Sequence, residues 1–109
     1  MDFVKFYFIN KIGIMNPLIP VIKDKNESIV DVNKFVHCDK DSERIFKIVH
    51  IQNVYMGWDY IHSIISVYSL SIDKPVHIIL QHVRNSSGTF VLIDGQGIEW
   101  CIKNNYKNI

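Results

Sequence analysis

The sequence contains no alanine. Alanine is the strongest helix former, so its absence removes the commonest residue of long helices and favours sheet. Arginine is nearly as scarce, with Arg44 and Arg84 only, and the 12 basic residues almost balance the 11 acidic ones. A groove for nucleic acid needs clustered cations. We therefore do not expect nucleic acid as a partner.

Cysteine is also scarce: Cys38 and Cys101 show neither the spacing of a metal site nor the density of a secreted disulfide scaffold. No apolar stretch reaches the roughly 18 uncharged residues of a membrane span. Two lysines interrupt the apolar opening of the chain, which indicates a strand over 3–9 and not a signal peptide. These features predict a single cytoplasmic domain over 1–109, without membrane contact, metal or cofactor.

The middle of the chain is harder to interpret. Residues 12–27 include two prolines and are expected to be a connector, because proline is excluded from helix interiors and central strands. Residues 28–37 fit a helix and a short strand equally well, whereas β-branched residues favour a strand over 43–51. After Gly57, polar residues recur every three or four positions. This spacing predicts a helix over 58–70, with a serine-containing strand as the competing interpretation.

The last part of the chain predicts a β-meander. Strands over 76–83, 89–93 and 98–103 are separated by the turn sequences Asn-Ser-Ser-Gly and Asp-Gly-Gln-Gly. Regular alternation in the third strand places Cys101 on the more solvated face, beside Glu99. We therefore expect an α+β fold, in which a three- to five-stranded, mainly antiparallel sheet ends in this meander and one or two helices pack on one face.

One set of residues has the order of a catalytic triad. Cys38 is followed by His77 and His82 on one predicted strand, and by Asp94 at the end of the next. A cysteine nucleophile needs a base within hydrogen-bond reach and a third group that orients the base. In chain order and spacing, this set is similar to transglutaminase-like and papain-like cysteine hydrolases over residues 38–94. The resemblance implies a hydrolase or transferase with Cys38 as its nucleophile.

The surroundings of these residues favour a structural interpretation. The small residues typical of such a nucleophile are missing around Cys38, and the neighbouring Asp39 and Asp41 raise a thiol's pKa. His77 and His82 are five residues apart, so a regular strand points them to opposite faces. We interpret His82 as a core histidine with a satisfied hydrogen bond, and we keep the cysteine hydrolase as an alternative function.

Aromatic residues gather around Gly57: Tyr55, Trp58 and Tyr60, with His62 beside them. Tyrosine and tryptophan are the usual anchors of protein interfaces, although a core role for these rings fits equally well. We predict a non-enzymatic protein that binds and blocks another protein through these four residues, as immunity proteins and phage counter-defence proteins do. A third hypothesis is a homodimer that pairs through an exposed edge of the last meander strand.

Overall fold

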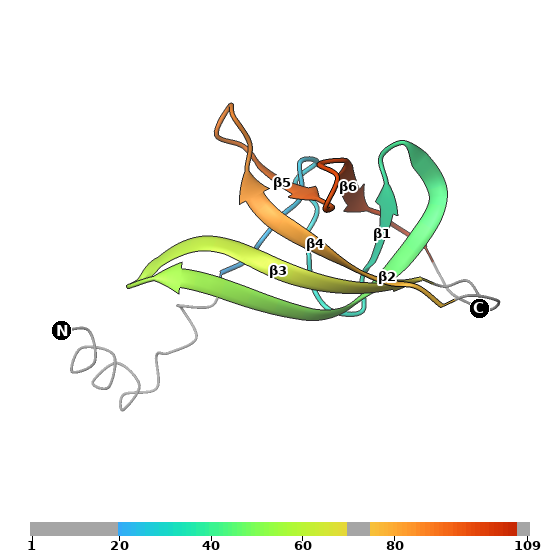
Figure 1. Cartoon of the computed structure of the whole chain (residues 1–109), viewed down its shortest axis with the longest axis horizontal. Coiled ribbons are helices and arrows are strands. Elements are labelled where there is room, and N and C mark those ends of the chain that lie inside the picture. The colour runs from blue at the N-terminus through green and yellow to red at the C-terminus, as the bar shows by residue number, and fades with distance from the viewer. Residues whose placement is uncertain (1–19, 70–74, 107–109) are drawn as a thin grey trace.

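Strands make up the regular structure of residues 20–69 and 75–106, the part of the chain that the computed structural model describes. Six antiparallel strands follow one another in chain order, and the last pairs with the first, so that the sheet closes into a barrel (Figure 1). They are β1 (Phe35–Cys38), β2 (Asp41–Met56), β3 (Asp59–Ser69), β4 (His77–Arg84), β5 (Phe90–Ile93) and β6 (Glu99–Ile102). Closure gives each strand a neighbour on both sides over at least part of its length.

The expected α+β fold is wrong, because the described residues contain no helix and form an all-β barrel. Most of the helix predicted over 58–70 is β3. Within this strand Ile61 has no partner on β2, which makes it a β-bulge. The extra residue shifts the alternation, so that Tyr60 and Ser63 both face inward, with their hydroxyl oxygens 2.6 Å apart. A bulged strand with polar and apolar residues on both faces therefore has the spacing of a helix.

Other strand predictions are confirmed. The strand over 43–51 is part of β2, and the three meander strands correspond to β4, β5 and β6. Residues 28–37, left open between helix and strand, contain most of β1, and Ile29 forms an isolated bridge with Lys23. The strand predicted over 3–9 lies outside the described residues.

The barrel interior is a continuous apolar core around Trp100. This ring is fully buried and makes an edge-to-face contact with Phe46, with 5.2 Å between centroids. Its indole N–H donates to Asp94 Oδ2 at 3.0 Å, which satisfies the polar end of the side chain. The other buried members of this core are Ile22, Val30, Val36, Cys38, Ile48, Ile65, Val67, Leu80, Leu92 and Ile102.

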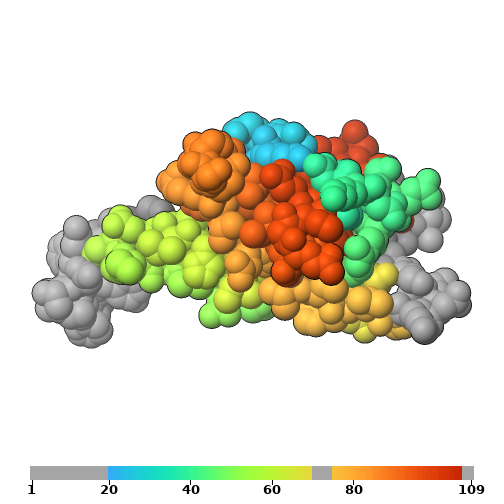
Figure 2. Space-filling model, turned by 45° about the horizontal axis from the view of Figure 1, so that its top comes forward, coloured from blue at the N-terminus to red at the C-terminus, as the bar shows by residue number. Residues whose placement is uncertain are grey.

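Residues 20–34, here named the strap, fasten β4 to β6. Asp24 Oδ1 accepts two backbone N–H groups of its own turn, at 2.9 and 2.8 Å. Its Oδ2 accepts the N–H of Ile102 in β6 at 2.8 Å, and the Lys23 carbonyl lies 2.8 Å from His82 Nε2 in β4. In the space-filling view, the blue strap packs beside the orange and red surface of β4 to β6 (Figure 2). Residues 20–27, which belong to the predicted connector, therefore tie β4 to β6.

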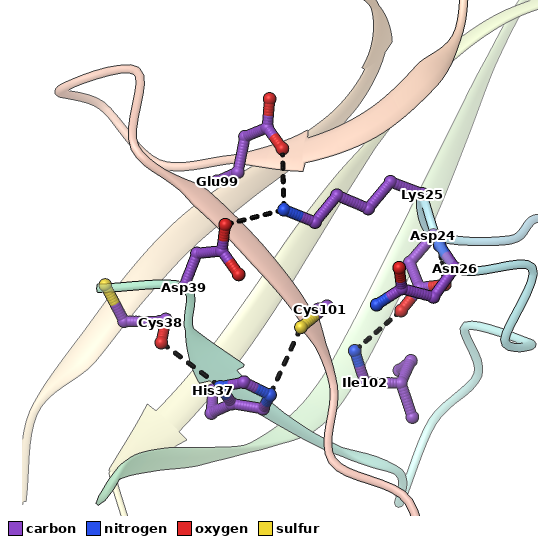
Figure 3. Close-up of polar contacts among 9 residues, drawn as sticks. All are labelled: Asp24, Lys25, Asn26, His37, Cys38, Asp39, Glu99, Cys101 and Ile102. Atoms are coloured by element: carbon purple, nitrogen blue, oxygen red, sulfur yellow. Dashed lines mark hydrogen bonds and ion pairs between the residues drawn. The ribbon is translucent and has the colours of Figure 1, made fainter. Parts of the chain in front are cut away.

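The strap also explains why Cys101 is buried, against our expectation. Cys101 shares the outer face with Glu99 as predicted, yet it is only 5% exposed. The Lys25 ammonium, which comes from the strap, bonds Asp39 at 2.6 Å and Glu99 at 3.1 Å beside the thiol (Figure 3). Both faces of β6 are therefore covered, and the alternation within one strand cannot reveal this.

We expect Cys38 and Cys101 to resist iodoacetamide in the native protein and to react once the chain unfolds, because both thiols are buried. Asp24→Ala removes the carboxylate that ties the strap to β6, so it should speed labelling of Cys101 by about tenfold or more. Mass spectrometry of the labelled peptides measures both rates. Equal acceleration at Cys38, which lies in the core, would indicate general unfolding and not release of the strap.

Candidate functional site

The four residues of the triad-like set are not brought together. Cys38 is buried in the barrel core, whereas His77 is exposed on β4, where its ring lies 6.1 Å from that of Tyr68. His82 faces the interior from the same strand as His77. No hydrogen bond within the described residues joins Cys38 to either histidine or to Asp94. The geometry therefore supplies no base for the Cys38 thiol.

Asp94 stabilises the turn between β5 and β6. Its Oδ1 accepts the backbone N–H groups of Gln96 at 2.8 Å and Ile98 at 3.0 Å, and its Oδ2 accepts the indole N–H of Trp100. Burial would raise the pKa of the Asp94 carboxyl, but these hydrogen bonds lower that pKa below its usual value. The carboxylate is therefore ionised and holds the turn that the sequence predicted.

A cysteine–histidine contact is present elsewhere, between Cys101 in β6 and His37 in β1. The thiol lies 3.1 Å from His37 Nε2, and His37 Nδ1 lies 3.1 Å from the Cys38 carbonyl (Figure 3). A carbonyl can only accept, so Nδ1 carries the proton and Nε2 accepts from the thiol. Sequence reasoning missed this pair, because the two residues meet only when β6 pairs with β1.

The surroundings of Cys101 keep its thiol protonated. Burial raises the pKa of the thiol, and the carboxylates of Asp39 and Asp24 raise it further, while Lys25 opposes them. Hydrogen bonds to Asp39 and Glu99 raise the pKa of Lys25 to about 12, so this ammonium stays charged, but it is one cation between two carboxylates and leaves no net positive charge beside the thiol. An activated nucleophile needs a thiolate stabilised by positive charge. The pair with His37 therefore holds β1 to β6 and does not form an activated nucleophile.

A polar cluster lies inside the barrel beside the apolar core. The Tyr60 hydroxyl is 2.7 Å from His82 Nδ1 and 2.6 Å from Ser63 Oγ, and Ser63 donates to Asn53 Oδ1 at 2.6 Å. His82 Nε2 donates to the Lys23 carbonyl. Burial lowers the pKa of His82 and raises the pKa of Tyr60, so both side chains stay neutral. The prediction that His82 is a core histidine with satisfied hydrogen bonds is confirmed.

The residues predicted to bind a partner lie on a hairpin that we name the arm, residues 53–62. Here β2 and β3 pair only with each other, because β1 pairs with β2 no further than Lys47 and β4 pairs with β3 only from Ser63 onward. The arm extends past the other strands in Figure 1. At its tip Gly57 has a φ of 63°, which glycine adopts without strain in a two-residue hairpin turn.

The arm places the four predicted residues in different surroundings. Tyr55 is 38% exposed, and its ring lies 6.0 Å from that of Tyr60, which turns inward to the polar cluster. Trp58 is half-buried in the turn, and His62 is half-buried on β3. Met56, which sequence reasoning missed, is 73% exposed beside the turn. The glycine of Met-Gly-Trp-Asp was a sequence signal for a hairpin tip at this point.

Comparison with known proteins gives no relative: no family model, no curated protein and no solved structure matches the chain. Within residues 20–69 and 75–106, no group of three or more His, Cys, Asp or Glu side chains is placed to hold a metal ion. Over the same residues, no helix has the length and apolar character needed to cross a membrane. We take the arm as the candidate functional site, because it lies outside the closed part of the barrel and carries exposed apolar side chains.

Proposed function

We propose that this protein is a small protein-binding module that blocks its partner stoichiometrically, as immunity-type and anti-defence inhibitors do, and that the arm is its binding element. The observation that carries the proposal is the position of Tyr55 and Met56 at the end of β2 and of Trp58 in the following turn, beyond the closed part of the barrel. Asp59 carries the only full charge in the arm. Interface cores are enriched in aromatic residues and methionine and depleted in charge, which is the composition of this tip.

The two other hypotheses receive less support. A cysteine hydrolase needs an activated thiol, but Cys38 lies in the core and Cys101 is held protonated. A homodimer through the last meander strand needs a free edge, and that expectation is wrong because β6 pairs with β1 on one side and with β5 on the other. We propose the cytoplasm as the site of action, since both cysteines are free thiols.

Truncating the aromatic anchor of the arm should weaken binding of the partner more than it lowers the stability of the fold. We expect Trp58→Ala to lower the affinity for the partner by about 30-fold, or roughly 2 kcal/mol, as at other aromatic hot spots. Ile79→Ala is the matched control, because Ile79 is a large apolar side chain exposed on β4, away from the arm. The wild type and the Trp58→Ala and Ile79→Ala variants are each used for affinity capture from a lysate of the source cells. Mass spectrometry of the captured proteins identifies the partner. Titration with the purified partner then gives the dissociation constants.

Thermal melting of the same variants separates binding from stability. The arm would be supported as the binding element if a captured protein were lost with the Trp58→Ala variant and retained with the Ile79→Ala variant, while both variants kept the melting temperature of the wild type. Equal capture by all three proteins, or a loss that merely follows unfolding of the Trp58 variant, would refute it.

A further inference from the structure

β2 has a backbone edge at Ile51 and Asn53, beyond the end of β1, with which no described residue pairs. Pairing with β1 stops at Lys47, and the strap adds two hydrogen bonds at Ile48, from Asn33 N–H and to the Lys34 carbonyl. At Ile51 and Asn53, further along β2, no backbone hydrogen bond within the described residues reaches the edge opposite β3.

The register shows which backbone groups face this edge. The N–H and C=O of Ile48 bond the strap, so they point away from β3. One extra residue, Val49, follows as a β-bulge in the pairing with β3. Because backbone groups alternate between the two sides of a strand and a bulge shifts the alternation by one, the N–H and C=O groups of Ile51 and Asn53 point away from β3.

A groove of about 390 Å³ adjoins the same stretch, between β2 and the strap. Ile51 and Asn53 line it from β2. The strap contributes three exposed aliphatic side chains: Val21 at 71%, Ile29 at 50% and Val32 at 43% exposure. Asp31 is the one charged residue among the described residues that line the groove, and its carboxylate accepts the N–H of Val32 at 2.7 Å. The groove therefore joins apolar walls to unpaired backbone donors and acceptors.

We propose that the partner contributes an extended segment, which pairs with this edge of β2 as an added strand and places its apolar side chains in the groove. The inference rests on the proposed function and names the kind of partner that the site takes. A helix satisfies its own backbone groups and has none to offer an edge, whereas an extended chain supplies both donors and acceptors. Alternate residues of the segment face the groove, so these residues are apolar and uncharged.

The added strand lies beside the arm, because the edge at Ile51 and Asn53 continues directly into Tyr55 and Met56. Backbone pairing would supply affinity for any extended chain, and the groove would select apolar residues at every second position. The arm residues would then contact whatever part of the partner follows the paired segment.

The test is a displayed library of random peptides of about twelve residues, selected on the full-length chain. We expect enriched peptides to carry apolar residues at alternate positions. Val21→Lys should weaken their binding by about tenfold or more, whereas the control Ile79→Lys should leave it unchanged. Both side chains are exposed, so neither change should unfold the barrel. Hydrogen exchange followed by NMR should show new protection of the Ile51 and Asn53 amides in the presence of the peptide.

The failure of strand addition can be told apart from the failure of the proposed function. Strand addition would be overturned if the selection enriched no peptide. It would also be overturned if the enriched peptides bound the Val21→Lys variant as tightly as the wild type and left the Ile51 and Asn53 amides unprotected. Protection that appears in the chain alone and rises with its concentration would assign the edge to a second copy, and would overturn it as well. In each of these cases, a protein partner that the wild type captures and the Trp58→Ala variant does not would still support the arm as the binding element.

Discussion

Trp100→Ala should lower the free energy of unfolding by about 3 to 5 kcal/mol, the cost of emptying a large aromatic site in a core. Trp100 is fully buried at the centre of the barrel and packs edge-to-face on Phe46, and the Arg44 guanidinium lies 5.5 Å from its ring. The substitution also leaves Asp94 Oδ2 without the indole donor. Trp100 lies on β6, the strand that closes the barrel onto β1, so the substitution removes core contacts next to the pairing that closes the sheet.

Urea unfolding followed by circular dichroism measures this loss. Trp100→Phe should recover part of it, because a smaller ring keeps some contact with Phe46 but cannot donate to Asp94. Val49→Ala is the control for a large-to-small change outside the core, since Val49 is half-exposed at a bulge, and it should cost no more than about 1 kcal/mol. If Trp100→Ala were as mild as Val49→Ala, the barrel core described above would be incorrect.

The strands of the last third could be predicted because two independent signals agreed there. Alternating apolar residues end at turn sequences that begin with Asn85 or Asp94 and contain glycine, and β4, β5 and β6 follow those boundaries closely. The strand at 59–69 could not be recognised in the same way, since a bulge at Ile61 breaks its alternation. Barrel closure left no local signal at all, because β1 and β6 are joined by contacts such as Cys101 with His37, 64 positions apart.

The candidate site was partly predictable for a related reason. The aromatic composition around Gly57 pointed to the residues of the arm, but it could not tell which ring turns inward. Tyr60 does so because the bulge rotates it toward His82, whereas Tyr55 stays partly exposed. The backbone edge at Ile51 was beyond sequence reasoning, since it exists only because β1 is much shorter than β2.

The strap illustrates what composition alone leaves out. The connector predicted over 12–27 is confirmed for its described part, 20–27, which contains no helix or strand, yet its turn carries Asp24, a carboxylate that is 2% exposed and bonds the backbone of β6. A buried carboxylate is tolerated only when hydrogen bonds satisfy it, and here backbone N–H groups do so. Nothing in the local sequence distinguishes this aspartate from one in a solvated loop.

Acidification should weaken the fold through His82. Burial disfavours the charged ring and holds the pKa of His82 below its ordinary value of about 6.5, while the Lys23 carbonyl and Asp24 act in the opposite direction with smaller effect. The unfolded chain therefore takes up the proton at a higher pH than the folded chain does. The stability contributed by the neutral ring is fully present above about pH 6.5, and it is lost as the pH falls from there toward the pKa of the folded state.

The contacts of His82 show how this pH dependence can be tested. Nδ1 accepts from the Tyr60 hydroxyl in the neutral ring, and Nε2 donates to the Lys23 carbonyl, so both ring nitrogens have partners without an added proton. We expect His82→Leu to cost about 2 to 3 kcal/mol at neutral pH, because the Tyr60 hydroxyl and the Lys23 carbonyl lose their partner. The same variant should abolish the loss of stability between about pH 7.5 and about pH 5. His77→Gln replaces an exposed histidine on the same strand and is the matched control, which should keep the wild-type slope. Urea unfolding of the three proteins across this range measures the slopes, and a slope that persists in His82→Leu would assign the pH dependence to another group.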